Sequence, residues 1–99
     1  MASYSTRIPY GSFPGRTEIP VAVYGRRWCG ISQMVRRFLE RAGIPYDYVD
    51  LEQHPEIESR LAWVTGGRVH TPVVYVGGEV LVQPTIRELQ WALSRSGVR

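Results

Sequence analysis

Apolar positions along the chain follow two periods, and the changes between them predict the order of elements. The run from Ile19 to Tyr24 is short, continuous and rich in β-branched residues, which is typical of a buried strand. After Gly30, apolar side chains recur every three or four positions, which predicts one buried face of a helix. The members of that face are Ile31, Met34, Val35, Phe38, Leu39 and Ala42. Gly43 and Pro45 then end the helix.

The same alternation of strand and helix continues after residue 45. Residues 46–51 alternate between apolar and polar side chains and predict a second strand. Pro55 suits the first position of a second helix, which Gly66-Gly67 ends. The buried face of this helix is expected to carry Ile57, Leu61 and Val64.

A hairpin and a third helix complete the pattern. Residues 73–76 and 79–82 read as two strands joined by a two-residue turn at Gly77-Gly78. Thr85 with Glu88 three positions later forms a capping box, which marks the start of the last helix.

The resulting order is β-α-β-α-β-β-α. A strand–helix–strand opening implies a parallel pair, and the closing hairpin adds an antiparallel pair. We therefore predict an α/β protein with a mixed four-stranded sheet and helices on both faces, which is the thioredoxin-like architecture. Residues 18–99 form its one domain. Residues 1–17, rich in Ser, Gly, Pro and Tyr, are predicted to be a flexible N-terminal arm.

Composition narrows the classes of function. No apolar run reaches the ~20 residues that cross a bilayer, and no secretory signal is evident, so we expect a cytoplasmic monomer without a membrane partner. The single cysteine excludes an intramolecular disulfide and a zinc site built from several cysteines. His54 and His70 lack the spacing of metal ligands.

The formal charge of +3 comes from arginine alone, since the chain has no lysine. Residues 1–45 hold seven Arg against two Glu, so the positive surplus surrounds Cys29 and the helix after it. A nucleic-acid binder usually adds a larger surplus and a docking motif, and this chain has no such motif. We therefore exclude nucleic acid as the partner.

Cys29 stands where a buried strand gives way to a helix. Free N–H groups and the positive end of the helix dipole gather there and stabilise a thiolate, which is the nucleophile of disulfide exchange. Arg26 and Arg27 would act in the same direction. A lone cysteine is more commonly a small buried apolar residue. The polar loop before Cys29 and the open Gly30 after it favour the reactive interpretation.

Ser32 lies one helical turn beyond Cys29, where a second cysteine would form a disulfide with it and release bound substrate. With serine there, chemistry at Cys29 stops at a mixed disulfide until an external thiol attacks. Two alternatives stay open. Ser32 is simply a residue suited to a helix start, or it replaces a cysteine of the natural protein.

Three further positions have both a functional and a structural interpretation. Trp28 is either a lid beside the thiol or a surface aromatic. A cis Pro72 would expose the Thr71 backbone to an extended peptide or small thiol, although most X–Pro bonds are trans. The N–H groups after Thr85 could hold a carboxylate, although capping alone explains this residue.

These residues together resemble the glutaredoxin family. The resemblance rests on Tyr24–Ser32 (YGRRWCGIS), on residues 43–50, on Thr71-Pro72 and on the glycine pairs at 66–67 and 77–78. It covers residues 19–97, and the stretch 81–85 is most similar to the mycoredoxin branch. The family implies a thioredoxin fold and the reduction of mixed disulfides between proteins and a low-molecular-weight thiol, either glutathione or mycothiol, as a cosubstrate that is not tightly bound.

Several site roles follow from the resemblance alone. Cys29 matches the nucleophile, Pro72 the cis-proline, and Thr71 the residue whose backbone grips the small thiol. Arg26 stands where many members carry a basic residue. Trp28, Pro84 and Thr85 complete the expected thiol-binding set. Gln83-Pro84-Thr85 replaces the Gly-Cys-Asp that holds the glutamyl end of glutathione, which favours mycothiol as the thiol.

Two other functions compete with this one. Cys-Gly-Ile-Ser is close to the Cys-Gly-Phe-Ser of monothiol glutaredoxins, in which two subunits and two small thiols share a [2Fe–2S] cluster. Cys29 would then be the metal ligand, but the lysine that those proteins keep before the motif is missing here. The third class is a binding module that keeps the fold without exchange activity.

Overall fold

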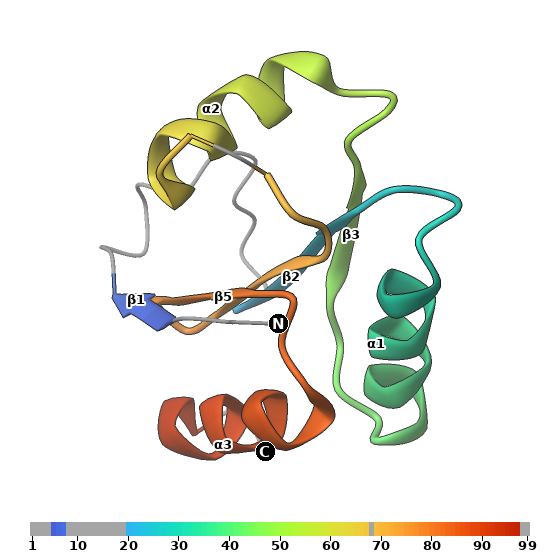
Figure 1. The fold of residues 1–99 in the computed structure, drawn as a ribbon. Coiled ribbons are helices and arrows are strands. Elements are labelled where there is room, and N and C mark those ends of the chain that lie inside the picture. Colours follow the sequence, from blue (N-terminus) through green and yellow to red (C-terminus); the bar gives the residue numbers. More distant parts are fainter. Residues whose placement is uncertain (1–4, 8–19, 68, 98–99) are drawn as a thin grey trace.

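The computed structural model of the chain describes residues 5–7, 20–67 and 69–97. In order along the chain, these residues form the elements β1 (Ser5–Arg7), β2 (Val21–Gly25), α1 (Gly30–Arg41), β3 (Asp47–Asp50), α2 (Pro55–Thr65), β4 (Val73–Val76), β5 (Glu79–Val82) and α3 (Ile86–Ser96). From β2 onward this is the predicted β-α-β-α-β-β-α order (Figure 1).

The sheet has the strand order β1-β5-β4-β2-β3. β2 and β3 pair in parallel, as a strand–helix–strand connection requires, and the remaining pairs are antiparallel. The mixed sheet predicted from the sequence is thereby confirmed in β2 to β5.

The fifth strand, β1, differs from the prediction. Ser5–Arg7 was expected in a flexible arm, but these residues pair antiparallel with β5, from Ser5 opposite Leu81 to Arg7 opposite Glu79. The rest of the predicted arm, residues 1–4 and 8–17, lies outside the described residues, as does Ile19 of the predicted first strand.

Two apolar clusters cover the two faces of the sheet. On one face, Val35 and Leu39 of α1 and Leu89 and Leu93 of α3 pack against side chains of the central strands. On the other face, Leu61 of α2 packs with members of a second cluster, which also holds Ala22, Tyr24, Leu51, Val73, Tyr75 and Val80. Both faces of β2 and β4 are therefore buried, which explains why these strands read as continuous apolar runs.

The helix ends follow their sequence signals. Thr85 and Glu88 form the predicted capping box, with Thr85 Oγ1 accepting from the Glu88 amide at 3.1 Å and Glu88 Oε1 accepting from the Thr85 amide at 2.9 Å. Gly66 closes α2 with a φ of 92°, a left-handed conformation that glycine adopts without steric cost. Ile57 and Leu61 lie on the inner face of α2 as predicted, and the side chain of Val64 falls outside the described part.

Candidate active site

Cys29 is the N-cap residue of α1. Its backbone is extended (φ −88°, ψ 112°), and its sulfur accepts a hydrogen bond from the Ser32 amide with 3.4 Å between Sγ and N. The thiol thus takes the place that a serine or aspartate oxygen takes in most helix caps. The side chain is only partly buried, so that a disulfide can reach the sulfur.

The carbonyl of Thr71 lies on the other side of this sulfur. Sγ donates to it over 3.7 Å, and the Thr71–Pro72 peptide bond that follows is cis, as the resemblance implied. The pairing of β2 with β4 explains why the Cys29 sulfur and the Thr71 carbonyl lie close together, because Tyr24 near the end of β2 lies opposite Val73 at the start of β4. Residues 42 positions apart therefore converge at one edge of the central strand pair.

Gln83 has a role in the site that the sequence did not predict, since the sequence singled it out only within Gln83-Pro84-Thr85, as a departure from the family's contacts for glutathione. Its side-chain amide donates to the Thr71 carbonyl at 3.1 Å, and its backbone N–H donates to the Pro72 carbonyl at 2.8 Å. Gln83 has a φ of 50°, which is uncommon outside glycine. The residue ties the start of β4 to the end of β5, and a glutamine between a strand and a helix carries no signal for such a clamp.

The structure corrects the role predicted for Arg26. We expected its guanidinium to act on the thiol, but Arg26 Nη2 forms an ion pair with Glu58 Oε2 of α2. Both side chains are about one-third exposed. The positive charge of Arg26 is therefore balanced by a carboxylate, and the groups that act on the Cys29 pKa lie in α1 and at Thr71 instead.

Ser32 is fully buried below the thiol, and its hydroxyl has no hydrogen-bond partner of normal geometry among the described residues. A Cβ atom on Gly25 would come within 2.6 Å of Ser32 Oγ and within 3.3 Å of Tyr48 Cε1. The Tyr48 hydroxyl is also buried and unpartnered in the described part of the chain. Gly25 thus lets α1 approach β2 closely enough to enclose the serine.

The pKa of Cys29 lies below its ordinary value, although partial burial alone would raise it. The side chains of Ser32 and Thr71 and the amides of Ser32 and Ile31 outweigh burial because they stabilise the thiolate. The contribution of Ser32 Oγ comes from its proximity, since its geometry falls short of a normal hydrogen bond. The arrangement therefore favours the ionised, nucleophilic form of the sulfur.

Replacing Ser32 by alanine is expected to raise the pKa of Cys29, because it removes a buried dipole that favours the thiolate. The rate of iodoacetamide alkylation as a function of pH measures this directly, and its midpoint should move to higher pH in Ser32→Ala. Ser59→Ala, an exposed serine of α2, is the matched control and should leave the midpoint in place. An unchanged midpoint in Ser32→Ala would show that the hydroxyl has no influence on the sulfur.

The other predicted site residues differ in exposure. Trp28 lies next to Cys29, and 84% of its surface is in solvent. Pro84 is buried, while Thr85 is exposed and caps α3. The structure thus brings Cys29, Ser32, Thr71 and Pro72 together, and it assigns Thr85 a capping role.

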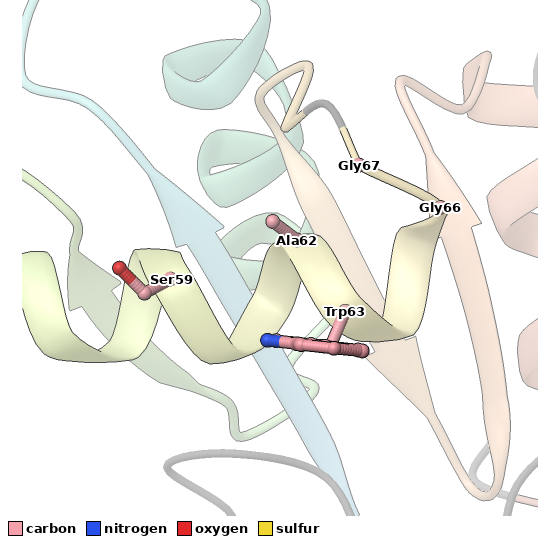
Figure 2. A pocket seen from close by; sticks show the side chains of 5 residues that line it. All are labelled: Ser59, Ala62, Trp63, Gly66 and Gly67. Carbon is pink, nitrogen blue, oxygen red and sulfur yellow. The ribbon is translucent and has the colours of Figure 1, made fainter.

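A separate hollow of about 420 Å³ lies on α2, away from all of the predicted site residues. Figure 2 labels Ser59, Ala62 and Trp63 along this helix, followed by Gly66 and Gly67 at its end. Within the described residues, no three His, Cys, Asp or Glu side chains gather as a metal site would require. None of the helices described is both long and apolar enough to span a bilayer.

Comparison with known proteins gives a consistent result. The family model described as Glutaredoxin matches residues 21–81. The monothiol glutaredoxin-S9 of Oryza sativa subsp. japonica is 36% identical over 64 residues, which cover 65% of this chain and 47% of that protein. The chain spans about half the length of the curated relatives it matches.

Solved structures show the same fold. The crystal structure of the holo form of glutaredoxin C1 from Populus tremula x tremuloides is 26% identical, with a TM-score of 0.64 and coverage of 82% of this chain and 81% of that one. The buckwheat glutaredoxin–glutathione complex is 22% identical, with a TM-score of 0.65 and coverage of 81% of both chains.

Proposed function

Because this chain belongs to the glutaredoxin family of thiol redox proteins, we propose that it reduces mixed disulfides between proteins and a low-molecular-weight thiol. The observation that carries the proposal is the environment of Cys29. The Cys29 residue is partly exposed, and its sulfur caps α1, lies 3.7 Å from the Thr71 carbonyl and has a lowered pKa. The absence of any second cysteine makes the reaction monothiol.

The reaction proceeds in two exchanges. The Cys29 thiolate attacks the sulfur of the small thiol in the mixed disulfide, and the protein thiolate leaves and takes up a proton. Cys29 now carries the small thiol as a new disulfide. A second small thiol, as its thiolate, attacks the sulfur of that adduct, which releases the Cys29 thiolate and a small-molecule disulfide. In the net reaction, the mixed disulfide and one free small thiol become a protein thiol and the symmetric disulfide of the small thiol, so the free small thiol is the reductant.

The groups around the sulfur support both exchanges. The amides and side chains that favour the Cys29 thiolate increase the fraction of the sulfur that can attack and make it a better leaving group afterwards. In this proposal, the backbone of Thr71 beside Pro72 aligns the incoming disulfide, and Gln83 holds that backbone in place through two hydrogen bonds. Trp28, Pro84 and Thr85 are proposed to contact the small thiol.

The small thiol is proposed to be glutathione or mycothiol. Glutathione is supported by the buckwheat glutaredoxin–glutathione complex, whose fold this chain shares. Mycothiol is supported by Gln83-Pro84-Thr85, which stands where typical members carry the contacts for glutathione. Both thiols present a sulfur that Cys29 can attack, and they differ in the polar end that must be bound.

The test is reduction of one model protein that carries glutathione or mycothiol on a single cysteine, with the same thiol as reductant. We expect turnover with one of the two, and intact-mass measurement of the quenched reaction should show that thiol on Cys29. Folded protein without turnover in either pair would contradict the proposal and point to a binding module. A [2Fe–2S] spectrum after anaerobic purification would instead favour the cluster-binding function.

A further inference from the structure

The surface next to Cys29 is unusually apolar for a solvent-exposed face. Trp28, Ile31 and Met34 are 84%, 40% and 46% exposed, and they flank the thiol on both sides in sequence. They make up three of the five large apolar side chains that are exposed in the described part of the chain. The other two, Trp63 and Trp91, lie on α2 and α3. Apolar side chains that gather in this way commonly mark a contact surface for another protein.

Along α1, exposed arginines follow the apolar side chains of this surface. Met34, Arg37 and Arg41 lie within about 60° of one another around the helix axis, and Ile31 lies about 60° from Met34 and about 120° from Arg37. Arg27, Arg37 and Arg41 are exposed. The one acidic residue of α1, Glu40, accepts a hydrogen bond from the Tyr46 hydroxyl at 2.5 Å. The outer face of α1 therefore joins an apolar end beside the thiol to a cationic end.

The other arginines near the site are engaged elsewhere. Arg26 pairs with Glu58. Arg36 donates to the Tyr46 hydroxyl at 3.3 Å, and its guanidinium lies 4.0 Å from the centre of the Tyr48 ring. Arg27, Arg37 and Arg41 are exposed, so their guanidinium groups are accessible to carboxylates of a binding protein. Opposite charges on two approaching surfaces raise the rate of encounter and select the partner.

We infer that the surface beside Cys29, made of Arg27 and Trp28 in the loop before α1 and of Ile31, Met34, Arg37 and Arg41 on the helix, docks protein substrates in which the modified cysteine lies among acidic and apolar side chains. This inference rests on the proposed function and specifies its substrate class. Apolar side chains of the substrate cover Trp28, Ile31 and Met34, and its carboxylates reach the arginines. The mixed disulfide is then held at Cys29 for the exchange described above.

The test uses synthetic peptides of equal length that carry one cysteine as a mixed disulfide with the small thiol found active. One peptide has Glu and Leu around the cysteine, and the second has Lys in place of Glu. We expect kcat/KM for the acidic peptide to be about tenfold higher, chiefly through KM, because several exposed ion pairs each contribute modestly. The preference should shrink as salt is raised from about 0.01 to about 0.5 M.

Two variants with the same change of charge separate a local contact from a general effect of net charge. Arg37→Glu changes the proposed surface, and Arg60→Glu changes an exposed position of α2 on the opposite side of the sheet. Each peptide rate is divided by the rate of the same variant on hydroxyethyl disulfide with the same small thiol. We expect this ratio for the acidic peptide to fall about threefold or more in Arg37→Glu and to stay constant in Arg60→Glu.

A binding measurement makes the inference independent of turnover. In the Cys29→Ser protein, reduced acidic peptide should shift the NMR amide signals of Trp28, Ile31 and Met34 more than the basic peptide does. The inference would be overturned if the normalised rates for the acidic and basic peptides were equal, or if Arg37→Glu and Arg60→Glu lowered the normalised rate for the acidic peptide equally. It would also be overturned if the NMR amide signals of α1 did not shift. Failure of every small disulfide would contradict the proposed function instead, and the NMR experiment would still decide the docking surface.

Discussion

Cys29→Ser is expected to yield a folded protein whose rate of mixed-disulfide reduction equals the uncatalysed background. The substitution removes the only thiol of the chain, and the serine hydroxyl cannot replace the thiolate as the group that attacks a disulfide. The fold should be preserved because Cys29 is an N-cap and serine is among the preferred N-cap residues. The rate at which the variant reduces the mixed disulfide of the small thiol measures activity, and the thermal unfolding midpoint measures whether the fold is preserved.

The alanine variant adds a control for the role of the cap. Cys29→Ala removes both the nucleophile and the acceptor for the Ser32 amide, so it should be inactive and less stable than Cys29→Ser by about 1 kcal/mol. If Cys29→Ser kept measurable turnover above background, the sulfur would not be the reacting atom, and the proposed function would fail.

Gly25→Ala is expected to destabilise the protein by about 1–3 kcal/mol, the usual cost of overpacking a core. The added methyl would lie 2.6 Å from Ser32 Oγ and 3.0 Å from Ser32 Cβ, and Ser32 is fully buried within the first turn of α1. The helix therefore has to move away from β2, and Cys29 at its start moves with it. Urea denaturation measures the loss, and the alkylation rate of Cys29 reports the displacement.

Gly30→Ala is the matched control. A Cβ atom there meets nothing within 4 Å, and Gly30 is the first residue of α1. Alanine has the higher helix propensity, so the free energy of unfolding should stay constant or rise by up to about 1 kcal/mol. Equal losses of stability in the two variants would show that the contact of Gly25 with Ser32 does not limit the packing.

The helices and inner strands could be predicted because local patterns and burial agree in them. The apolar positions of α1 fall at helical spacing, and Val35 and Leu39 are fully buried as that spacing predicts. Ile31 and Met34 were predicted on the same buried face, and the structure corrects this, because they are 40% and 46% exposed beside the thiol. β2 and β4 read as unbroken apolar runs since helices cover both faces of the sheet. Cys29 could be placed at a helix start for the same reason, because the strand before it and the helix after it are both well marked.

Features that depend on distant contacts could not be predicted. Ser5–Arg7 has no apolar alternation, and only its pairing with β5 makes it a strand. The ion pair of Arg26 with Glu58 joins residues 32 positions apart, and nothing near Arg26 in sequence reveals its partner. The side-chain hydrogen bond of Gln83 joins it to Thr71, 12 positions away, and nothing near Gln83 in sequence reveals that partner.

The strand order has a consequence for local unfolding. Strands at the margins of a sheet open more readily than strands that are paired on both sides, and β1 and β3 occupy the two margins here. Cys29 follows β2 and Thr71-Pro72 precedes β4, and these two strands pair with each other and with one more strand each. The separation between the sulfur and the carbonyl facing it is therefore set by the central strand pair rather than by a strand at either margin.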